Sequence, residues 1–398
     1  MKGLLASGSG ATRCGSAAAS VMLACWLASA CAPSGGERRD EGSASGELGV
    51  VVRIAPDPSD RERYCAWYGD ARAGVLYFGE SAFWNAMRAA GGDPAADLRE
   101  PGPQLVGRFD LARERFLPPL ATGARASRAG TWDVLAHPNG RVYFTTFYES
   151  AGYVDPATGA SRRFESAGTG LNELALGPDS RTLLATRYTA DGSVVVLDAD
   201  GTVTAEHPLA RPDPRVRVAP KSLAFDPVRR EVWVNTDLVP AAETRPALEG
   251  VGVGHDARVL DFATGRELRR FAEPELQFMR FEPDGRGLFV WQAGTRLALR
   301  VVEPGRAEGP DSGREIPLDD AFPAQHDFVQ DLSVGPDGRV LATRWSGAVH
   351  VVSPSGEVRT AQLPRLAPGG LYYAAVAVGD RLCATYCADV EVVCAPLH

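Results

Sequence analysis

Polar and aromatic residues recur at one position of a segment that is repeated along this chain. The position lies two residues before an apolar step such as Leu174-Ala175, on the N-terminal side of a turn that contains proline. If the repeats surround a common axis, side chains at this position converge, and converging polar groups are typical of a small-ligand site. The alternative is that they are only hydrated, because the centre of such a ring holds water. Aligned on the turn, with a looser match in the first repeat, the position holds Arg63, Trp132, Asn172, Lys221, Gln277 and Gln330.

The next position along each repeat is predicted to face the opposite way, because side chains alternate along a strand. It holds Asp133, Glu173, Ser222, Phe278 and Asp331.

The repeated segment itself predicts four short antiparallel strands. Residues 329–357 show it best, with apolar strands separated by Pro-Asp-Gly, Ser-Gly and Pro-Ser-Gly turns. Asp-Gly and Ser-Gly tolerate the positive φ angles that let neighbouring strands fold back on each other. Units of this kind, at about forty residues each, are typical of β-propeller blades. The predicted fold class is therefore all-β, a single β-propeller of seven four-stranded blades.

The last predicted blade has only three strands, within residues 373–394. Residues 49–54 form an apolar segment near the N-terminus that can supply the fourth. Pairing the two chain ends removes the free strand edges that an open ring would expose. We therefore predict one propeller domain over residues 49–398, closed by an N-terminal strand.

The stretch 171–183 (LNELALGPDSRTL) resembles a strand of the gluconolactonase and regucalcin-like propellers, and residues 329–345 resemble a late blade of the same proteins. The resemblance implies a divalent metal such as calcium at the tunnel mouth and hydrolysis of sugar lactones. Asn172 matches the Asn ligand of that family, whereas its Asp and Glu positions hold Gln330 and Arg63 here. A hard divalent cation needs several oxygen ligands. The resemblance extends equally to non-enzymatic YVTN-type and NHL-type propellers, so it indicates the fold and leaves lactonase-like chemistry as an alternative.

Other chemical signals are sparse. His326 and Asp327 are the one neighbouring pair suited to acid–base work, and the alternative is a polar pair in a surface loop. The connections at residues 79–103 and 238–256 are long, and long loops on a rigid scaffold commonly carry binding residues. Insertions without function are the alternative. No phosphate loop, dinucleotide fingerprint or haem-attachment motif occurs.

Residues 1–30 have the pattern of an export signal. Lys2 and Arg13 precede a short apolar run, and residues 28–30 (Ala-Ser-Ala) form a small-residue cleavage site. The stretch 27–31 (LASAC) resembles a bacterial lipobox, which implies lipid attachment at Cys31. A plain secretory signal is the alternative. Residues 31–48 are rich in Gly, Ser and charge, so we predict a flexible tether. The predicted location is the bacterial cell envelope, lipid-anchored on the periplasmic or outer face of a membrane, or, under the alternative, secreted and soluble.

The predicted domain contains four cysteines, and an even number in an exported domain suggests disulfides. If residues 388–389 form a hairpin tip, Cys383 and Cys394 lie opposite each other. Cys387 can then reach Cys65 across the seam between blades 7 and 1. Four cysteines allow three pairings, and a metal site is the alternative to disulfides.

The net charge of −8 argues against nucleic acid or an anionic membrane surface as the main partner. We expect a monomer without a cofactor, whose only contact with a bilayer is through its N-terminal anchor. The predicted function is non-enzymatic binding of a small molecule or a protein partner through the loop-rich face. The alternative is a metal-dependent lactonase-like hydrolase or lyase with its site at the tunnel mouth.

Overall fold

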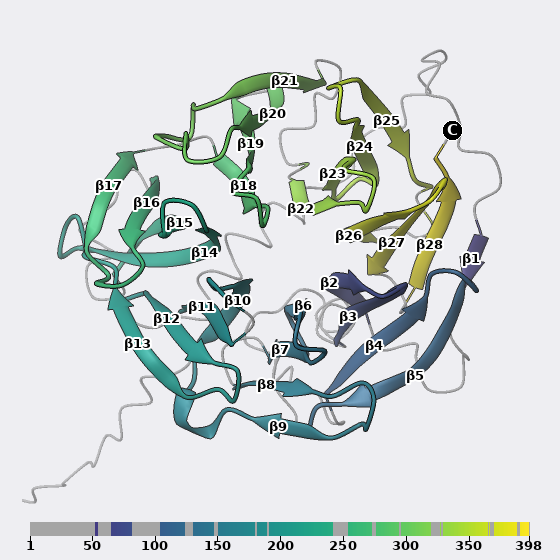
Figure 1. Ribbon diagram of the computed structural model, residues 1–398, viewed down its shortest axis with the longest axis horizontal. Coiled ribbons are helices and arrows are strands. Elements are labelled where there is room, and N and C mark those ends of the chain that lie inside the picture. The colour runs from purple at the N-terminus through teal and green to yellow at the C-terminus, as the bar shows by residue number, and fades with distance from the viewer. Residues whose placement is uncertain are drawn as a thin grey trace, which may run out of the picture.

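Seven four-stranded antiparallel sheets surround a central axis, and the innermost strand of each lies next to that axis (Figure 1). This confirms the predicted seven-bladed β-propeller. The computed structural model describes residues 52–54, 65–81, 104–123, 130–146, 150–179, 181–188, 191–241, 254–272, 276–293, 296–319, 327, 329–364, 366, 370–387 and 391–397. No helix among these residues is long and apolar enough to cross a membrane.

The strands of each blade are given in order from the innermost to the outermost. Blade 1 comprises β2 (Cys65–Arg72), β3 (Val75–Ser81), β4 (Leu105–Asp110) and β5 (Arg115–Ala121). Blade 2 comprises β6 (Val134–Ala136), β7 (Val142–Thr146), β8 (Ser150–Val154) and β9 (Ser161–Arg163), followed by the 3₁₀ turn η1 (Glu165–Ala167). Blade 3 comprises β10 (Leu171–Leu176), β11 (Thr182–Arg187), β12 (Ser193–Asp198) and β13 (Val203–Pro208).

The second half of the ring repeats the same plan. Blade 4 comprises β14 (Val216–Asp226), β15 (Glu231–Pro240), β16 (His255–Asp261) and β17 (Glu267–Ala272). Blade 5 comprises β18 (Leu276–Phe281), β19 (Gly287–Ala293), β20 (Arg296–Val302) and β21 (Arg314–Asp319). Blade 6 comprises β22 (Val329–Val334), β23 (Val340–Arg344), β24 (Ala348–Val352) and β25 (Val358–Gln362). Blade 7 comprises β26 (Leu371–Val378), β27 (Arg381–Cys387), β28 (Glu391–Pro396) and, from the N-terminus, β1 (Val52–Ile54).

The core lies between the blades, because each sheet is covered on both faces by its neighbours. The middle strands are therefore apolar at successive positions, as in β12, where residues 193–197 are all buried. Between blades 4 and 5, the fully buried Trp233 packs against Phe271 and Phe289, with ring centroids 6.0 and 5.1 Å away. Rigid packing of this kind between every pair of blades fixes the positions of the inner strands.

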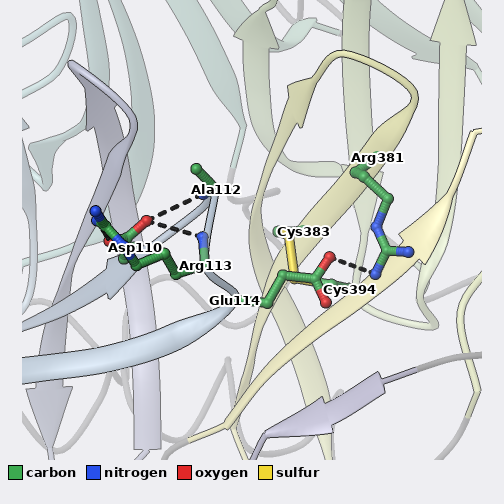
Figure 2. Close-up of a disulfide and its surroundings, with 7 residues drawn as sticks. All are labelled: Asp110, Ala112, Arg113, Glu114, Arg381, Cys383 and Cys394. Carbon is green, nitrogen blue, oxygen red and sulfur yellow. Dashed lines mark hydrogen bonds and ion pairs between the residues drawn. A yellow bond between two sulfur atoms is a disulfide. The ribbon is translucent and has the colours of Figure 1, made fainter.

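The ring is closed as the sequence predicts. Strand β1 pairs antiparallel with β28, so that Val52 lies opposite Cys394, and Figure 1 shows these two strands side by side. Cys383 and Cys394 lie opposite each other in β27 and β28 and form a disulfide (Figure 2). Cys387 is also disulfide-bonded, whereas the side chain of its predicted partner Cys65 lies outside those described.

An ion pair also crosses the seam between blades 1 and 7. Arg381, at the start of β27, lies 2.5 Å from the carboxylate of Glu114, in the turn between β4 and β5 (Figure 2). Asp110 holds that turn by accepting hydrogen bonds from the N–H groups of Ala112 and Arg113. The last blade is thus joined to the first by side chains as well as by packing.

A candidate binding site at the mouth of the tunnel

The innermost strands carry an irregularity at the same place around the ring. In six blades the ladder between the first and second strands shifts its register there. In blade 2, β6 begins just after the equivalent place, where Trp132 donates its N–H to the carbonyl of Thr145. Such bulges re-aim side chains and are frequent next to functional sites. We call the residues at this position the bulge ring: Trp67, Trp132, Asn172, Lys221, Gln277, Gln330 and Tyr373.

Five members of the bulge ring are the residues that the repeat alignment singles out: Trp132, Asn172, Lys221, Gln277 and Gln330. The looser match, Arg63, lies outside the described residues, and blade 1 places Trp67 in the ring instead. The reason is the turn after β2. It contains only Ala73 and Gly74, with φ of 51° and 77°, whereas blades 2 and 6 have longer turns of the His-Pro-Asn-Gly and Gly-Pro-Asp-Gly kind.

The residue after each member of the bulge ring forms a second set along the inner strands. We call this second set the tunnel ring: Tyr68, Asp133, Glu173, Ser222, Phe278, Asp331 and Ala374. Simple alternation separates the two sets, but the bulge brings them together. The indole Nε1 of Trp132 lies 3.5 Å from Oε1 of Glu173, and the hydroxyl of Tyr68 donates to Oε1 of Gln330 at 2.9 Å. Tyr68 belongs to blade 1 and Gln330 to blade 6, so this hydrogen bond joins two blades that are not neighbours and have blade 7 between them.

Aromatic rings form one wall of this opening. The ring of Trp67 lies 4.5 Å from that of Trp132 and 5.0 Å from that of Tyr373, between centroids. Tyr68 contacts the same two neighbours, at 5.5 Å for Trp132 and 5.2 Å for Tyr373. Trp67 and Tyr373 are fully buried, and Tyr68 is half-buried. Blades 7, 1 and 2 are therefore joined by a continuous aromatic cluster on their inner strands, of which Tyr68 is the most exposed member.

Three aspartates of the tunnel bind the backbone of the following blade. Asp133 accepts the N–H of Leu174 at 2.7 Å, Asp331 that of Ala375 at 3.2 Å, and Asp70 that of Ala136 at 3.1 Å. The inner edge of a propeller faces no further strand, so its amides need partners of another kind. These carboxylates supply them and hold adjacent inner strands together.

Glu173 differs from these three aspartates. The one hydrogen bond of its carboxyl group in the described part of the chain is the long contact with Trp132, and no backbone amide binds that carboxyl there. Burial and the neighbouring carboxylate of Asp133 raise the pKa of Glu173 well above its usual range. A carboxyl group that is not tied to the scaffold, beside an indole and a phenol, is free to engage a bound molecule.

The other tunnel carboxylates are also shifted. Burial raises the pKa of Asp133 and of Asp331 to about 7, against the hydrogen bonds that lower it. Arg280 on β18 lies near Asp331 and Asp70, and its positive charge opposes the increase in both. The Arg280 side chain is 42% exposed and donates from Nε to Glu282 at 2.9 Å. The tunnel thus combines several acidic groups with one guanidinium in the described residues.

Lys221 belongs to a separate polar group on blade 4. Its ammonium lies 3.1 Å from Oδ2 of Asp237, whose Oδ1 lies 2.5 Å from Nδ1 of His255. Although burial acts in the opposite direction, Lys221 and His255 lower the pKa of Asp237. The group stands where β15 and β16 enter the long connection of residues 242–253, which lies outside the described residues.

The remaining predicted site residues are placed as follows. Asp327 is buried, forms an ion pair with Arg344 at 3.0 Å and accepts the N–H of Ser346. These contacts hold the chain around β23 and give Asp327 a role in the fold. His326 and Cys31 lie outside the described residues. Asn172 is 7% exposed, and its Oδ1 has no hydrogen-bond partner in the described part of the chain. Within that part, no group of three or more His, Cys, Asp or Glu side chains is arranged to hold a metal ion.

No protein-family model matches the chain, and no curated protein matches it. Among solved structures, it is similar to a catalytically inactive histidine variant of virginiamycin B lyase from Staphylococcus aureus, solved with quinupristin. The TM-score is 0.55 at 9% identity, over 87% of this chain and 99% of that one. It is also similar to the β-propeller domain of Cps50 (Swd1) from Myceliophteria thermophila, with a TM-score of 0.53 at 11% identity, over 87% and 99% of the two chains. At these identities the similarities show the fold alone.

The alignment on turns missed five residues of the site: Trp67, Tyr68, Asp70, Arg280 and Tyr373. The strand that contains residues 65–70 (CAWYGD) is not followed by a turn with proline, so it could not be aligned with the other repeats. Arg280 lies three residues after the aligned position in blade 5. A usable signal was present in the clustering of aromatic and acidic residues within residues 64–70.

Proposed function

We propose that this protein is an exported, lipid-anchored β-propeller that binds a small ligand at the mouth of its central tunnel and is not an enzyme. The observation that supports it most directly is the hydrogen bond between Tyr68 and Gln330, which joins blades 1 and 6 on the inner side of the ring. Side chains from separate blades meet there on one frame. Aromatic side chains with a few placed polar groups are typical of small-molecule sites.

The site is also preorganised. The inner strands are fixed by packing between blades and by the aspartate bonds to the edge amides, so a ligand need not order them. Glu173 and the face of Trp132 then provide recognition groups held by the scaffold, whereas Asp133, Asp331 and Asp70 serve the scaffold itself.

A thermal-shift screen of purified protein tests ligand binding. Sugars, sugar lactones, carboxylic acids, amines and amino acids are each added to the wild-type chain and to a Trp132→Ala, Glu173→Gln double variant. We expect at least one compound to raise the Tm of the wild type by several degrees, since a ligand at about 100 times its Kd stabilises by about 2.7 kcal/mol. The same compound should leave the variant unchanged.

Two outcomes would contradict the proposal. One is a screen in which no compound stabilises the wild type, and the other is stabilisation that persists in the double variant. If the wild-type protein hydrolyses a lactone and Glu173→Gln does not, the site is catalytic and the binding-only function is wrong.

Lipid attachment is tested separately in bacterial cells that express the full chain. We expect labelled palmitate to be incorporated into the wild-type protein and not into Cys31→Ser, because the lipobox cysteine is the attachment point that the sequence resemblance implies. Cys387→Ser is the matched control and should remain labelled. Label that survives Cys31→Ser would leave a plain secretory signal as the better interpretation.

A further inference from the structure

Some of the acidic side chains around the tunnel lie near a positive charge, and others do not. Asp70 and Asp331 face the guanidinium of Arg280, whose charge lowers their pKa values against the effect of burial. Burial raises the pKa of both Asp133 and Glu173, the carboxylate of Asp133 raises that of Glu173 further, and the described residues near them contribute no cation. Lys221, the nearest ammonium in the bulge ring, is turned to Asp237 on β15. The acidic excess therefore lies on blades 2 and 3, beside Trp132.

A second observation concerns Asn172, which precedes Glu173 in the chain. Its side chain is more than nine-tenths buried, and Oδ1 is an acceptor without a partner in the described residues. Asn172 follows Trp132 in the bulge ring, and both are bound to Thr145: its Oγ1 donates to the carbonyl of Asn172, and its carbonyl accepts the N–H of Trp132. A buried acceptor without a donor is costly, so this site is suited to a molecule that brings N–H groups.

The surrounding groups share one chemical requirement. Glu173 and Asn172 offer oxygen acceptors, and Ser222, the next residue of the tunnel ring, has a buried Oγ without a partner in the described residues. Trp132 and Tyr68 add aromatic faces, which attract cations. A primary ammonium has three donors, no acceptor and one positive charge. It satisfies these groups together, whereas a carboxylate or a hydroxyl group would not.

We propose that the ligand of the tunnel mouth is a primary amine, bound in its ammonium form by Glu173 and Asn172 against the face of Trp132. This inference rests on the ligand-binding function proposed above and specifies its chemical class. A metal ion fits less well, because the carboxylates are distributed around the tunnel and three of them already bind backbone amides.

Binding should be coupled to loss of a proton. Glu173 lies near Asp133 and Tyr68, and Tyr68 also lies near Asp331 and Tyr373. Burial raises the pKa values of Glu173 and Tyr68, so both groups stay protonated to higher pH than usual. An incoming ammonium needs a carboxylate, so the affinity should rise with pH. Alkyl ammonium groups titrate near about pH 10.4, so the ligand itself stays charged at the pH values of the experiment.

Isothermal titration with matched four-carbon probes tests the class. The probes are n-butylamine, butan-1-ol and sodium butyrate, with calcium chloride as a separate arm, each at about pH 6 and about pH 8.5. We expect n-butylamine alone to bind, with a Kd of about millimolar order for so small a ligand. Its affinity should be about fivefold higher at the upper pH, and Glu173→Gln and Asn172→Ala should each weaken it about tenfold, the effect of losing about 1.4 kcal/mol. The exposed Glu165→Gln should leave the affinity unchanged.

The two levels of the proposal fail in different ways. Butyrate, butanol or calcium binding better than butylamine in the wild type, and losing affinity in Glu173→Gln, would overturn the amine class and leave tunnel-mouth binding intact. Butylamine affinity that is unchanged in Glu173→Gln and Asn172→Ala would also overturn the amine site. Absence of binding by all four probes, together with a screen without stabilising compounds, would overturn the ligand-binding function as well.

Discussion

Asp133→Asn is expected to stabilise the folded protein at about pH 8 and to change its stability little at about pH 4. Burial raises the pKa of this carboxyl to about 7 in the folded protein, from its ordinary value of 3.8. The folded state therefore binds more protons than the unfolded state between these two values. The stability linked to the protonated form is complete below the unfolded pKa and is lost as the pH rises through the folded pKa.

Asparagine carries no charge at any of these pH values and keeps an oxygen that can accept the N–H of Leu174, but its NH₂ group replaces the oxygen that accepts the N–H of Val134. Three pKa units correspond to about 4 kcal/mol, and the lost hydrogen bond to Val134 reduces this, so we expect a gain of about 1–3 kcal/mol at the higher pH. Urea unfolding of the wild type and of Asp133→Asn, measured across about pH 4 to 8, gives the two stability curves. They should coincide at low pH and diverge as the pH rises.

Asp155 provides a control of opposite sign. This exposed turn residue accepts the N–H of Ala157, the main cause of its lowered pKa. Its contribution to stability is present above the unfolded pKa and is lost as the pH falls through the folded pKa. Asp155→Asn should therefore lower stability at neutral pH and have less effect in acid. A destabilisation of similar size by Asp133→Asn at about pH 8 would show that the Asp133 carboxylate stabilises the ring in its charged form.

The architecture could be predicted because its signals are local. Proline, Asp-Gly and Ser-Gly turns end strands wherever they occur, and apolar runs such as Ser193–Asp198 belong only to strands buried on both faces. The pairing of residues 52–54 with β28 follows once the last predicted blade lacks a strand, and the Cys383–Cys394 disulfide follows from the predicted hairpin tip at residues 388–389. Each of these inferences depends on neighbours in sequence or on the need to close a ring.

The site could be predicted only in part. A sequence pattern that alternates every two residues predicts which face of a strand a side chain takes, but it does not reveal a β-bulge that changes this alternation. Alternation separates Gln330 from Asp331, yet the shift between Val329 and Asp331 lets both approach the tunnel. Trp132 of the bulge ring likewise lies beside Glu173 of the tunnel ring, although alternation predicts that these two positions face opposite ways. Contacts between blades 1, 5 and 6, such as those of Tyr68 and Arg280, depend on the closed ring and leave no trace in any single repeat.

A chain that begins at residue 56 is expected to be much less stable than one that begins at residue 49. The shorter chain lacks β1, whose residues 52–54 pair with residues 392–394 of β28. Val392 and Cys394 are fully buried and pack in one cluster with Leu76 and Phe109 of blade 1. Loss of β1 leaves the edge of β28 unpaired and loosens this seam, which we expect to cost of the order of 3 kcal/mol out of the roughly 5–15 kcal/mol of a typical fold.

The longer chain is the matched control, because it also lacks the predicted signal and tether but keeps β1. Both chains retain the Cys383–Cys394 disulfide, so the hairpin of β27 and β28 stays joined in each and the difference reports ring closure alone. Thermal unfolding should give a clearly lower Tm for the chain from residue 56. Tryptophan fluorescence should change as well, since β26 carries Tyr373, which packs on Trp67 at the tunnel mouth. Equal Tm values would mean that packing between blades 7 and 1 holds the ring without the N-terminal strand, and that the strand pairing contributes little to the stability of the site.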